Sequence, residues 1–209
     1  TGPRLAAVLD SDVDAEHPWL ATEYVPGPSL ATAVADGGPL TPEAAVGVAA
    51  GVGEALAAIH ARGLVHRDVK PSNVLLAADG PRLIDFGIAR GATDSRLTRT
   101  GVALGTPQFM APEQIQGDRE TGPAADVFAL GGVLLFAMTG EYPFGEGSAV
   151  TLLYRIVHEA PRLDQVRPDL QPLLAACLDK DPGARPTAIE VAQYLGRLAD
   201  PERTVEVAT

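Results

Sequence analysis

The chain has 209 residues, which suit one domain with a real core, or one domain and a fraction. Its hydrophobic fraction of 46% is typical of a globular protein. Its formal net charge of -11 argues against nucleic acid as a partner, because an acidic surface repels a phosphate backbone. Cys177 is the only cysteine, which excludes an intramolecular disulfide and a zinc site built from several cysteines.

The sequence predicts no membrane segment. The first residues show no secretory signal. The longest clean apolar run, Val127 to Met138, is shorter than the roughly 20 residues that span a bilayer. The Ala- and Gly-rich stretch from Ala44 to Ile59 contains Glu54, which favours a soluble helix. With the single cysteine, this predicts a protein of a reducing compartment, the cytoplasm.

The first half of the chain alternates short strands with helices. Pro26-Gly27-Pro28 ends the second strand, and Ser29 and Thr41 are suitable helix caps, the latter followed by proline and glutamate. The predicted strands are Leu5–Leu9, Trp19–Val25, Leu64–His66, Val74–Leu76 and Arg82–Ile84, and the predicted helices start at Ser29 and Thr41 and end near Val34 and Arg62.

The second half is helical after a polar loop. Residues 91–105 carry threonine and serine hydroxyls without periodicity, which is typical of a loop. Helices are predicted at Ala124–Thr139, Ala149–His158, Leu170–Leu178 and Ala188–Leu198, with prolines between them. The last residues, 201–209, read as a tail or linker.

One short stretch carries the chemistry. His66-Arg67-Asp68-Val69-Lys70-Pro71-Ser72-Asn73 is followed by Asp85-Phe86-Gly87. The carboxylate of Asp68 can accept the hydrogen bond of an incoming hydroxyl, and Lys70 can place a positive charge on a phosphate. Asn73 and Asp85 offer the hard oxygen ligands that Mg²⁺ prefers. Together these groups are the set that phosphoryl transfer needs.

With Ala111-Pro112-Glu113 downstream, residues 4 to about 198 resemble a bacterial, eukaryotic-like serine/threonine protein kinase. The resemblance implies an α+β, protein-kinase-like fold with ATP and Mg²⁺ as cofactors and proteins bearing serine or threonine as substrates. It implies that Asp68 is the catalytic base, that Lys70 contacts the γ-phosphate, and that Asn73 and Asp85 hold magnesium. Lysine two positions after Asp68 is the serine/threonine pattern rather than the tyrosine pattern.

The resemblance also implies regulatory and structural roles. Arg67 resembles the arginine that pairs with a phosphorylated activation loop, with Thr98 and Thr100 as the phosphorylated residues and a homodimer as the arrangement for autophosphorylation. The residues with expected structural roles are Glu113 and Arg185, as a buried pair; Asp126, as the support of the catalytic loop; and His66 and Phe86, as packing residues.

For adenine, the resemblance implies a hinge at Glu23-Tyr24-Val25, where backbone groups of Glu23 and Val25 would contact the base. Thr22 would be the gatekeeper, and Leu75 would lie beneath the base. The corresponding division of the chain is an N-terminal-lobe remnant of two strands and the hinge at 1–25, the C-terminal lobe at 26–198 and a tail at 199–209.

The family pattern is incomplete in one region. No Gly-x-Gly-x-x-Gly loop and no Val-Ala-Ile-Lys segment precede the first strand, and Lys70 and Lys180 are the only lysines. We therefore expect an N-terminally truncated kinase that transfers phosphate weakly or not at all as this piece. In related bacterial kinases the catalytic domain often leads through a linker to a membrane helix, so a later segment could anchor the full-length protein.

Two other functions stay open. A degenerate kinase could serve as a binding scaffold, although a scaffold has no chemical need for Asp68, Lys70, Asn73 and Asp85 together. A small-molecule phosphotransferase can share this catalytic core, but the Ala-Pro-Glu segment and the threonine-bearing loop form a peptide-docking surface in the family.

Overall fold

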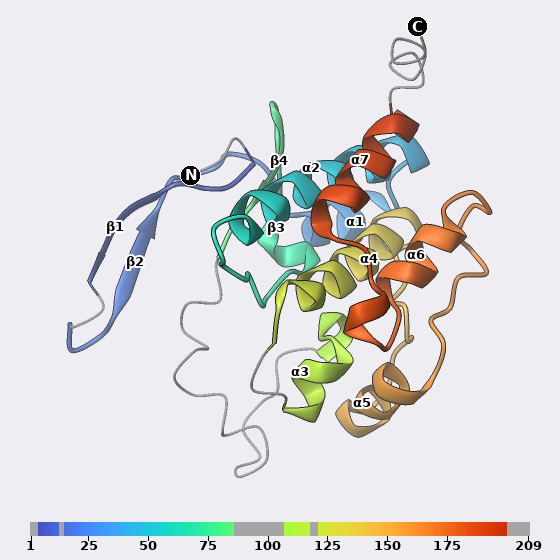
Figure 1. Ribbon diagram of the computed structural model, residues 1–209. Helices are drawn as coiled ribbons and strands as arrows, with labels where there is room; N and C mark the ends of the chain where they lie inside the picture. Colours follow the sequence, from blue (N-terminus) through green and yellow to red (C-terminus); the bar gives the residue numbers. More distant parts are fainter. Residues whose placement is uncertain (1–3, 13–14, 86–106, 118–120, 200–209) are drawn as a thin grey trace, which may run out of the picture.

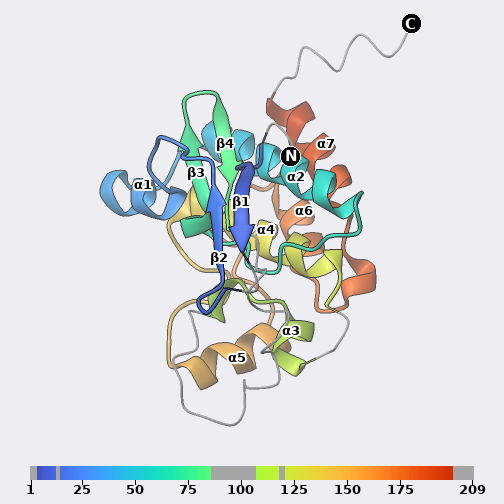
Figure 2. The same cartoon turned by 90° about the vertical axis from the view of Figure 1, so that its left-hand side faces the viewer.

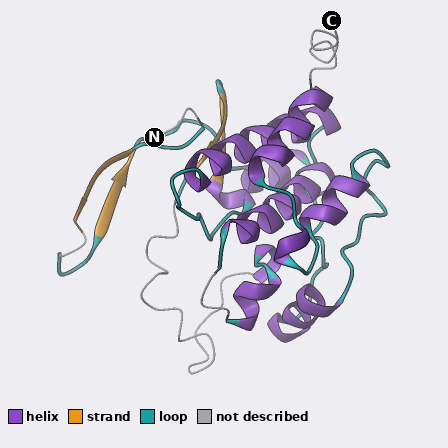
Figure 3. Cartoon of the chain, viewed as in Figure 1, coloured by secondary structure: helices purple, strands orange, loops and turns teal. Residues whose placement is uncertain are grey.

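The computed structural model describes residues 4–12, 15–85, 107–117 and 121–199. In these residues the structure consists of a body of helices and two small antiparallel sheets of two strands each (Figures 1 and 3). All four strands lie toward one side of the helices (Figure 2). This arrangement confirms the predicted α+β class with a mainly helical lobe.

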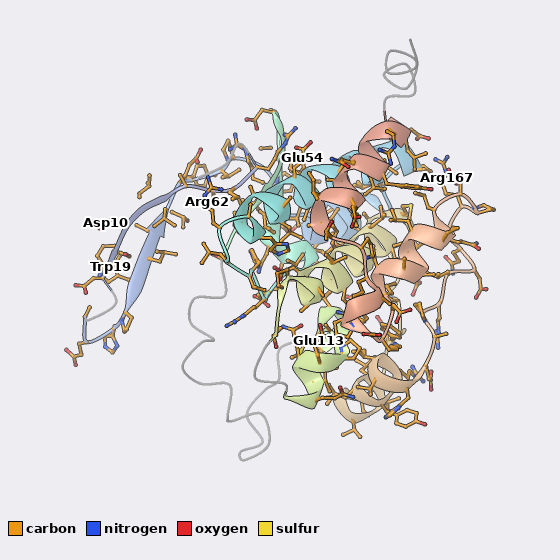
Figure 4. The ribbon with its side chains drawn as sticks, in the orientation of Figure 1. Asp10, Trp19, Glu54, Arg62, Glu113 and Arg167 are labelled. Carbon is orange, nitrogen blue, oxygen red and sulfur yellow. The ribbon has the colours of Figure 1, made fainter. Side chains whose placement is uncertain are left out.

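The first sheet is a hairpin that projects from the body. Strand β1 (Val8–Asp12) pairs with β2 (Trp19–Thr22), in a register that places Val8 opposite Thr22 and Asp12 opposite Trp19. Figure 4 shows Asp10 and Trp19 on this hairpin, away from the helices. The side chains of Leu9 and Trp19 are 68% and 47% exposed, so the hairpin adds little to the core.

The second sheet lies against the helical body. Strand β3 (Val74–Ala77) pairs with β4 (Gly80–Leu83), with Val74 opposite Leu83. Leu5, ahead of β1, forms a parallel bridge to Leu83, and Ser29 forms an antiparallel bridge to Leu75. These two bridges join the N-terminal residues to the sheet that ends at the candidate site.

The helices follow the predicted starts closely. Ser29 accepts a hydrogen bond from the backbone N–H of Thr32, and Thr41 accepts one from that of Ala44, so both act as N-caps. The helices are α1 (Leu30–Gly37), α2 (Pro42–His60), α3 (Pro112–Gln116), α4 (Pro123–Thr139), α5 (Ala149–His158), α6 (Gln171–Cys177) and α7 (Ala188–Ala199). Short 3₁₀ turns occur at Pro71–Asn73, Pro107–Phe109 and Pro182–Ala184.

The core forms where α2 packs against α4 and α7. Small residues permit the close approach: a Cβ added at Gly53 of α2 would lie 3.1 Å from that of Ala192 of α7. The buried leucines Leu56, Leu134 and Leu195 fill the remaining space. Truncation of such a leucine to alanine typically costs about 2–5 kcal/mol, so this packing contributes strongly to the stability of the helical body.

The predicted strand at Leu64–His66 is wrong, because this segment is a loop. The backbone N–H of His66 donates to a carboxylate oxygen of Asp126 rather than to a neighbouring strand. The first strand pair is also shifted: β1 begins three residues later than Leu5, and β2 ends at Thr22 rather than Val25. The domain boundaries predicted at residues 25 and 198 stay predictions.

Helix α2 has the length and apolar composition of a membrane span, and it is the one such helix among the described residues. Half of its most apolar window is buried inside the protein, where it contacts α4 and α7. The core helix of a soluble protein passes the same test, so composition does not distinguish the two here.

Candidate active site

Two side chains converge on the carboxylate of Asp68. The Nζ of Lys70 lies 2.8 Å from Asp68 Oδ2, and the side-chain amide of Asn73 donates to the same oxygen at 3.1 Å. The amide of Asn73 also donates to the backbone carbonyl of Asp68 at 2.8 Å. The loop from Asp68 to Asn73 therefore closes on itself and fixes the direction of the Asp68 carboxylate.

Asp126, near the start of α4, holds this loop from beneath. Its Oδ1 accepts a hydrogen bond from the backbone N–H of Arg67 at 2.7 Å, and its Oδ2 accepts one from that of His66 at 2.8 Å. Arg67 has a φ of 65°, in the left-handed region that residues with a side chain rarely adopt. The two bonds stabilise a backbone conformation that costs about 1–3 kcal/mol by itself.

His66 is fully buried and takes a structural position. Its Nε2–H donates to the carbonyl of Ile84 at 3.0 Å, and its Nδ1 accepts from the backbone N–H of Asp68 at 3.3 Å. Burial lowers the pKa of this imidazole below 6.5, although the nearby carboxylate of Asp126 acts in the opposite direction. The neutral ring thus links the segment before Asp85 to the backbone of Asp68.

Asn73 and Asp85 fit the expected magnesium ligands by their chemistry. The NH₂ group of Asn73 donates to Asp68, so the amide oxygen, which accepts only a long 3.5 Å hydrogen bond from the Ser72 hydroxyl among the described contacts, is the atom that could bind a cation. Asp85 is exposed at the end of the segment after β4, with a φ of 56°. One amide and one carboxylate oxygen suit Mg²⁺, which commonly takes few protein ligands and completes its shell with waters and phosphates.

Glu113 and Arg185 form a buried ion pair. Arg185 Nη1 donates to Glu113 Oε1 at 2.7 Å and Nη2 donates to Oε2 at 2.9 Å, in the two-pronged geometry that a guanidinium allows. Their side chains are 7% and 0% exposed, respectively. Arg185 also donates to backbone carbonyls, including that of Ala124 at 3.0 Å. Glu113 lies where α3 meets the helical body (Figure 4), so the pair fastens α3 to this body.

Sequence reasoning missed two polar residues that support the same loop. His60, at the end of α2, donates through Nε2 to Asp126 Oδ2 at 2.8 Å. Gln114 accepts a hydrogen bond from the backbone N–H of Ala111 at 2.9 Å and donates to the carbonyl of Arg67 at 3.3 Å. His60 is 66 positions from its partner and Gln114 is 47 positions from Arg67, so no local pattern marks either contact.

The residues expected around adenine come from both sheets: Thr22 ends β2, Glu23 and Val25 follow it, and Leu75 lies in β3. Val25 is buried, Thr22 and Leu75 are half-buried, and the side chain of Glu23 is exposed. The backbone N–H of Glu23 donates to the carbonyl of Ala7 at 2.8 Å, which continues the hairpin beyond β2. The predictions for Phe86, Thr98 and Thr100 lie outside the described residues.

A cavity of about 360 Å³ opens beside Asp68. The loop from His66 to Asn73 supplies Arg67, Asp68 and Lys70 to one side of it. The remaining lining comes from α1, from the 3₁₀ turn Pro107–Phe109 with the residues that follow it, from α4, and from Tyr142. A molecule bound in this cavity would therefore lie against the carboxylate that the loop holds in place.

The comparisons with known proteins agree with this geometry. The protein kinase domain family model matches residues 2–195. The chain is 48% identical over 190 residues to the serine/threonine-protein kinase AfsK of Streptomyces coelicolor, covering 91% of this chain and 24% of that protein. It is 50% identical over 194 residues to the probable serine/threonine-protein kinase PkwA of Thermomonospora curvata, covering 93% of this chain and 26% of that protein.

Among solved structures, the crystal structure of Rad53 1-466 in complex with AMP-PNP matches with a TM-score of 0.75 at 23% identity, covering 92% of this chain and 50% of that chain. This likeness concerns the fold. The fold and the loop around Asp68 are those of a protein kinase, and the chain belongs to the protein kinase domain family. Its bacterial serine/threonine kinase relatives confirm the resemblance, and the chain spans about a quarter of the length of the two named above.

Proposed function

We propose that this chain is the catalytic part of a bacterial kinase that transfers the γ-phosphoryl group of ATP to serine or threonine in proteins. One observation carries the proposal: the Lys70 ammonium and the Asn73 amide both meet Asp68 Oδ2, so the carboxylate, the cation and the amide lie within one hydrogen-bonded loop. Phosphoryl transfer depends on positioning and charge stabilisation, which such a loop supplies.

In this proposal each residue has a separate task. Asp68 accepts the hydrogen bond of the substrate hydroxyl and directs the oxygen toward the phosphorus. Lys70 stabilises charge on the transferred phosphoryl group. Asn73 and Asp85 would hold magnesium, which neutralises phosphate charge when it is bound. Thr22, Glu23, Val25 and Leu75 would form the adenine site.

The regulatory part of the proposal concerns Arg67. Its side-chain Nε is buried and has no hydrogen-bond partner among the described residues, so a further acceptor would be favourable there. A phosphate on Thr98 or Thr100 would supply such an acceptor, and a homodimer would allow one copy to phosphorylate the other. We place this activity in the cytoplasm, a reducing compartment that a chain with Cys177 as its single cysteine suits.

The test compares the full-length gene product with the 209-residue chain, using radiolabelled ATP, Mg²⁺ and a protein substrate. We expect transfer to serine or threonine by the full-length product and little or none by the 209 residues, because no lysine precedes Lys70 to hold the α- and β-phosphates. Asp68→Asn should lower kcat by about 10²-fold or more.

Phosphorylation of a small molecule but of no protein would contradict the proposed substrate class. Full activity of Asp68→Asn would contradict the proposed role of that residue. Phosphopeptide mapping of the full-length product after incubation with ATP tests Thr98 and Thr100, and the absence of phosphate on both would remove the regulatory part.

A further inference from the structure

The cavity beside Asp68 has an aromatic wall. Phe136 and Tyr142 stack with ring centroids 5.5 Å apart, and Phe109 meets them edge-on at 6.3 Å and 5.9 Å. Gly132 of α4 makes room for this cluster, because a Cβ at that position would lie 3.0 Å from Phe109 Cδ1. Ala31, Met110 and Ala129 extend the apolar lining.

The charged side chains that line the cavity are those of Arg67, Asp68 and Lys70, in the loop from His66 to Asn73, and that of Asp126, which holds this loop. Asp126 accepts hydrogen bonds from His60, His66 and Arg67, so its charge is already compensated. Asp68 pairs with Lys70. Away from the loop, the polar side chains are the neutral amides of Gln108 and Gln114 and the phenol of Tyr142. The described lining thus offers no carboxylate beyond Asp68 and Asp126 to a basic side chain.

We propose that this cavity selects substrates in which an apolar side chain, aliphatic or aromatic, lies next to the phosphorylated serine or threonine. This inference rests on the proposed function and adds the substrate class. A cavity of about 360 Å³ is large enough for one large side chain. A lysine or arginine entering it would lose its hydration without gaining an anionic partner, which is unfavourable even though the protein as a whole is acidic.

Peptide binding can be followed by NMR of the methionine methyl groups, without any catalytic assay. The chain has only two methionines, so each signal is easily assigned. Met110 lines the cavity, whereas Met138 packs against the hydrophobic core and serves as an internal reference. The 209-residue chain, labelled with ¹³C at the methionine methyl groups, is titrated with short serine peptides. These peptides carry Leu, Phe, Lys or Glu at one position at a time on either side of the serine.

We expect the Met110 signal to shift saturably with Leu or Phe peptides at one or two positions, while the Met138 signal stays unchanged. Lys peptides should bind about tenfold more weakly or worse, the scale at which an apolar pocket discriminates. Equal binding of Leu and Lys peptides, a preference for Glu, or the absence of any Met110 shift would overturn the inference.

A matched pair of variants tests the charge argument. Gln108→Glu adds a carboxylate to the lining at nearly constant shape, and Gln108→Met keeps the site neutral. The first should improve binding of Lys peptides about tenfold and the second should leave the apolar preference in place. Unchanged selectivity in Gln108→Glu would contradict the inference. If the full-length product phosphorylates no serine peptide, the proposed function fails, whereas the Met110 shift still reports on the cavity.

Discussion

Oδ1 of Asp126 accepts a hydrogen bond from the backbone N–H of Arg67 at 2.7 Å, at a residue whose φ is 65°. The side chain on α4 therefore stabilises a left-handed turn directly before Asp68. In Asp126→Asn one oxygen becomes an NH₂ group, which cannot accept from both His66 and Arg67. We expect a loss of about 1–3 kcal/mol in the free energy of unfolding and faster hydrogen exchange at these two amides.

The same change at exposed Asp164 removes one negative charge at the surface and serves as the control. Unchanged exchange protection at His66 and Arg67 in Asp126→Asn would show that Asp126 does not hold the loop.

The Glu113–Arg185 pair should show strong coupling in a double-mutant cycle. Glu113→Gln leaves the guanidinium of Arg185 buried without its anion, and we expect a cost of about 3–5 kcal/mol in urea denaturation. Arg185→Met should cost a similar amount, because it leaves the charge of Glu113 buried. The double variant should cost clearly less than the sum, whereas additivity within about 0.5 kcal/mol would mean that the two side chains act independently.

His66 should make the protein less stable as the solution becomes mildly acidic. Burial holds the pKa of its folded-state imidazole below 6.5, so between about pH 6.5 and that lower value the unfolded state binds a proton that the folded state does not. The free energy of unfolding of the wild type should therefore fall relative to His66→Gln from pH 7.5 to 5.5. The same substitution at exposed His17 is the control, and parallel curves for wild type and His66→Gln would refute the prediction.

Lys180 should make the free energy of unfolding depend on pH in the alkaline range. Its Nζ donates to the carbonyl of Ile156 at 2.5 Å and lies 4.0 Å from the ring centroid of Phe144. Burial, and then the charge of Arg185, lower the pKa of Lys180 from 10.5 to about 8. Between pH 8 and 10.5 the unfolded state binds more protons, so the free energy of unfolding should rise with pH.

In Lys180→Met this rise should disappear, while the stability difference between the two proteins stays constant from pH 6 to 7. Guanidinium unfolding of both proteins across this range measures the effect. If the difference in the free energy of unfolding between the two proteins stayed constant up to pH 10.5, Lys180 would keep its ordinary pKa. That outcome would mean that the contact of the charged ammonium with the ring of Phe144 offsets the effect of burial.

Local sequence signals were enough for the parts of the fold that local physics determines. The starts of α1 and α2 followed from the caps Ser29 and Thr41, and α5 was predicted with its observed bounds. The residues of the candidate site were recognisable because Asp68, Lys70 and Asn73 lie within six positions of one another. Short-range chemistry of this kind is visible without a structure.

The contacts that the sequence did not reveal join distant positions. Leu64–His66 reads as a strand by its apolar residues, but the partner of the His66 N–H is a side chain 60 positions away. The cavity likewise depends on the meeting of Phe109, Phe136 and Tyr142, which come from separate segments. Tertiary packing, rather than local propensity, decides such features.

The pairing of Glu113 with Arg185 also has a consequence for how the protein is made. The two residues are 72 positions apart, and Arg185 follows helices α1 to α6 but precedes α7. During synthesis, α3 cannot gain its buried anchor until the ribosome has released Arg185. A nascent chain that already contains Asp68 and Asp126 therefore still lacks this contact, so the loop around Asp68 is made well before α3 can be fastened to the helical body.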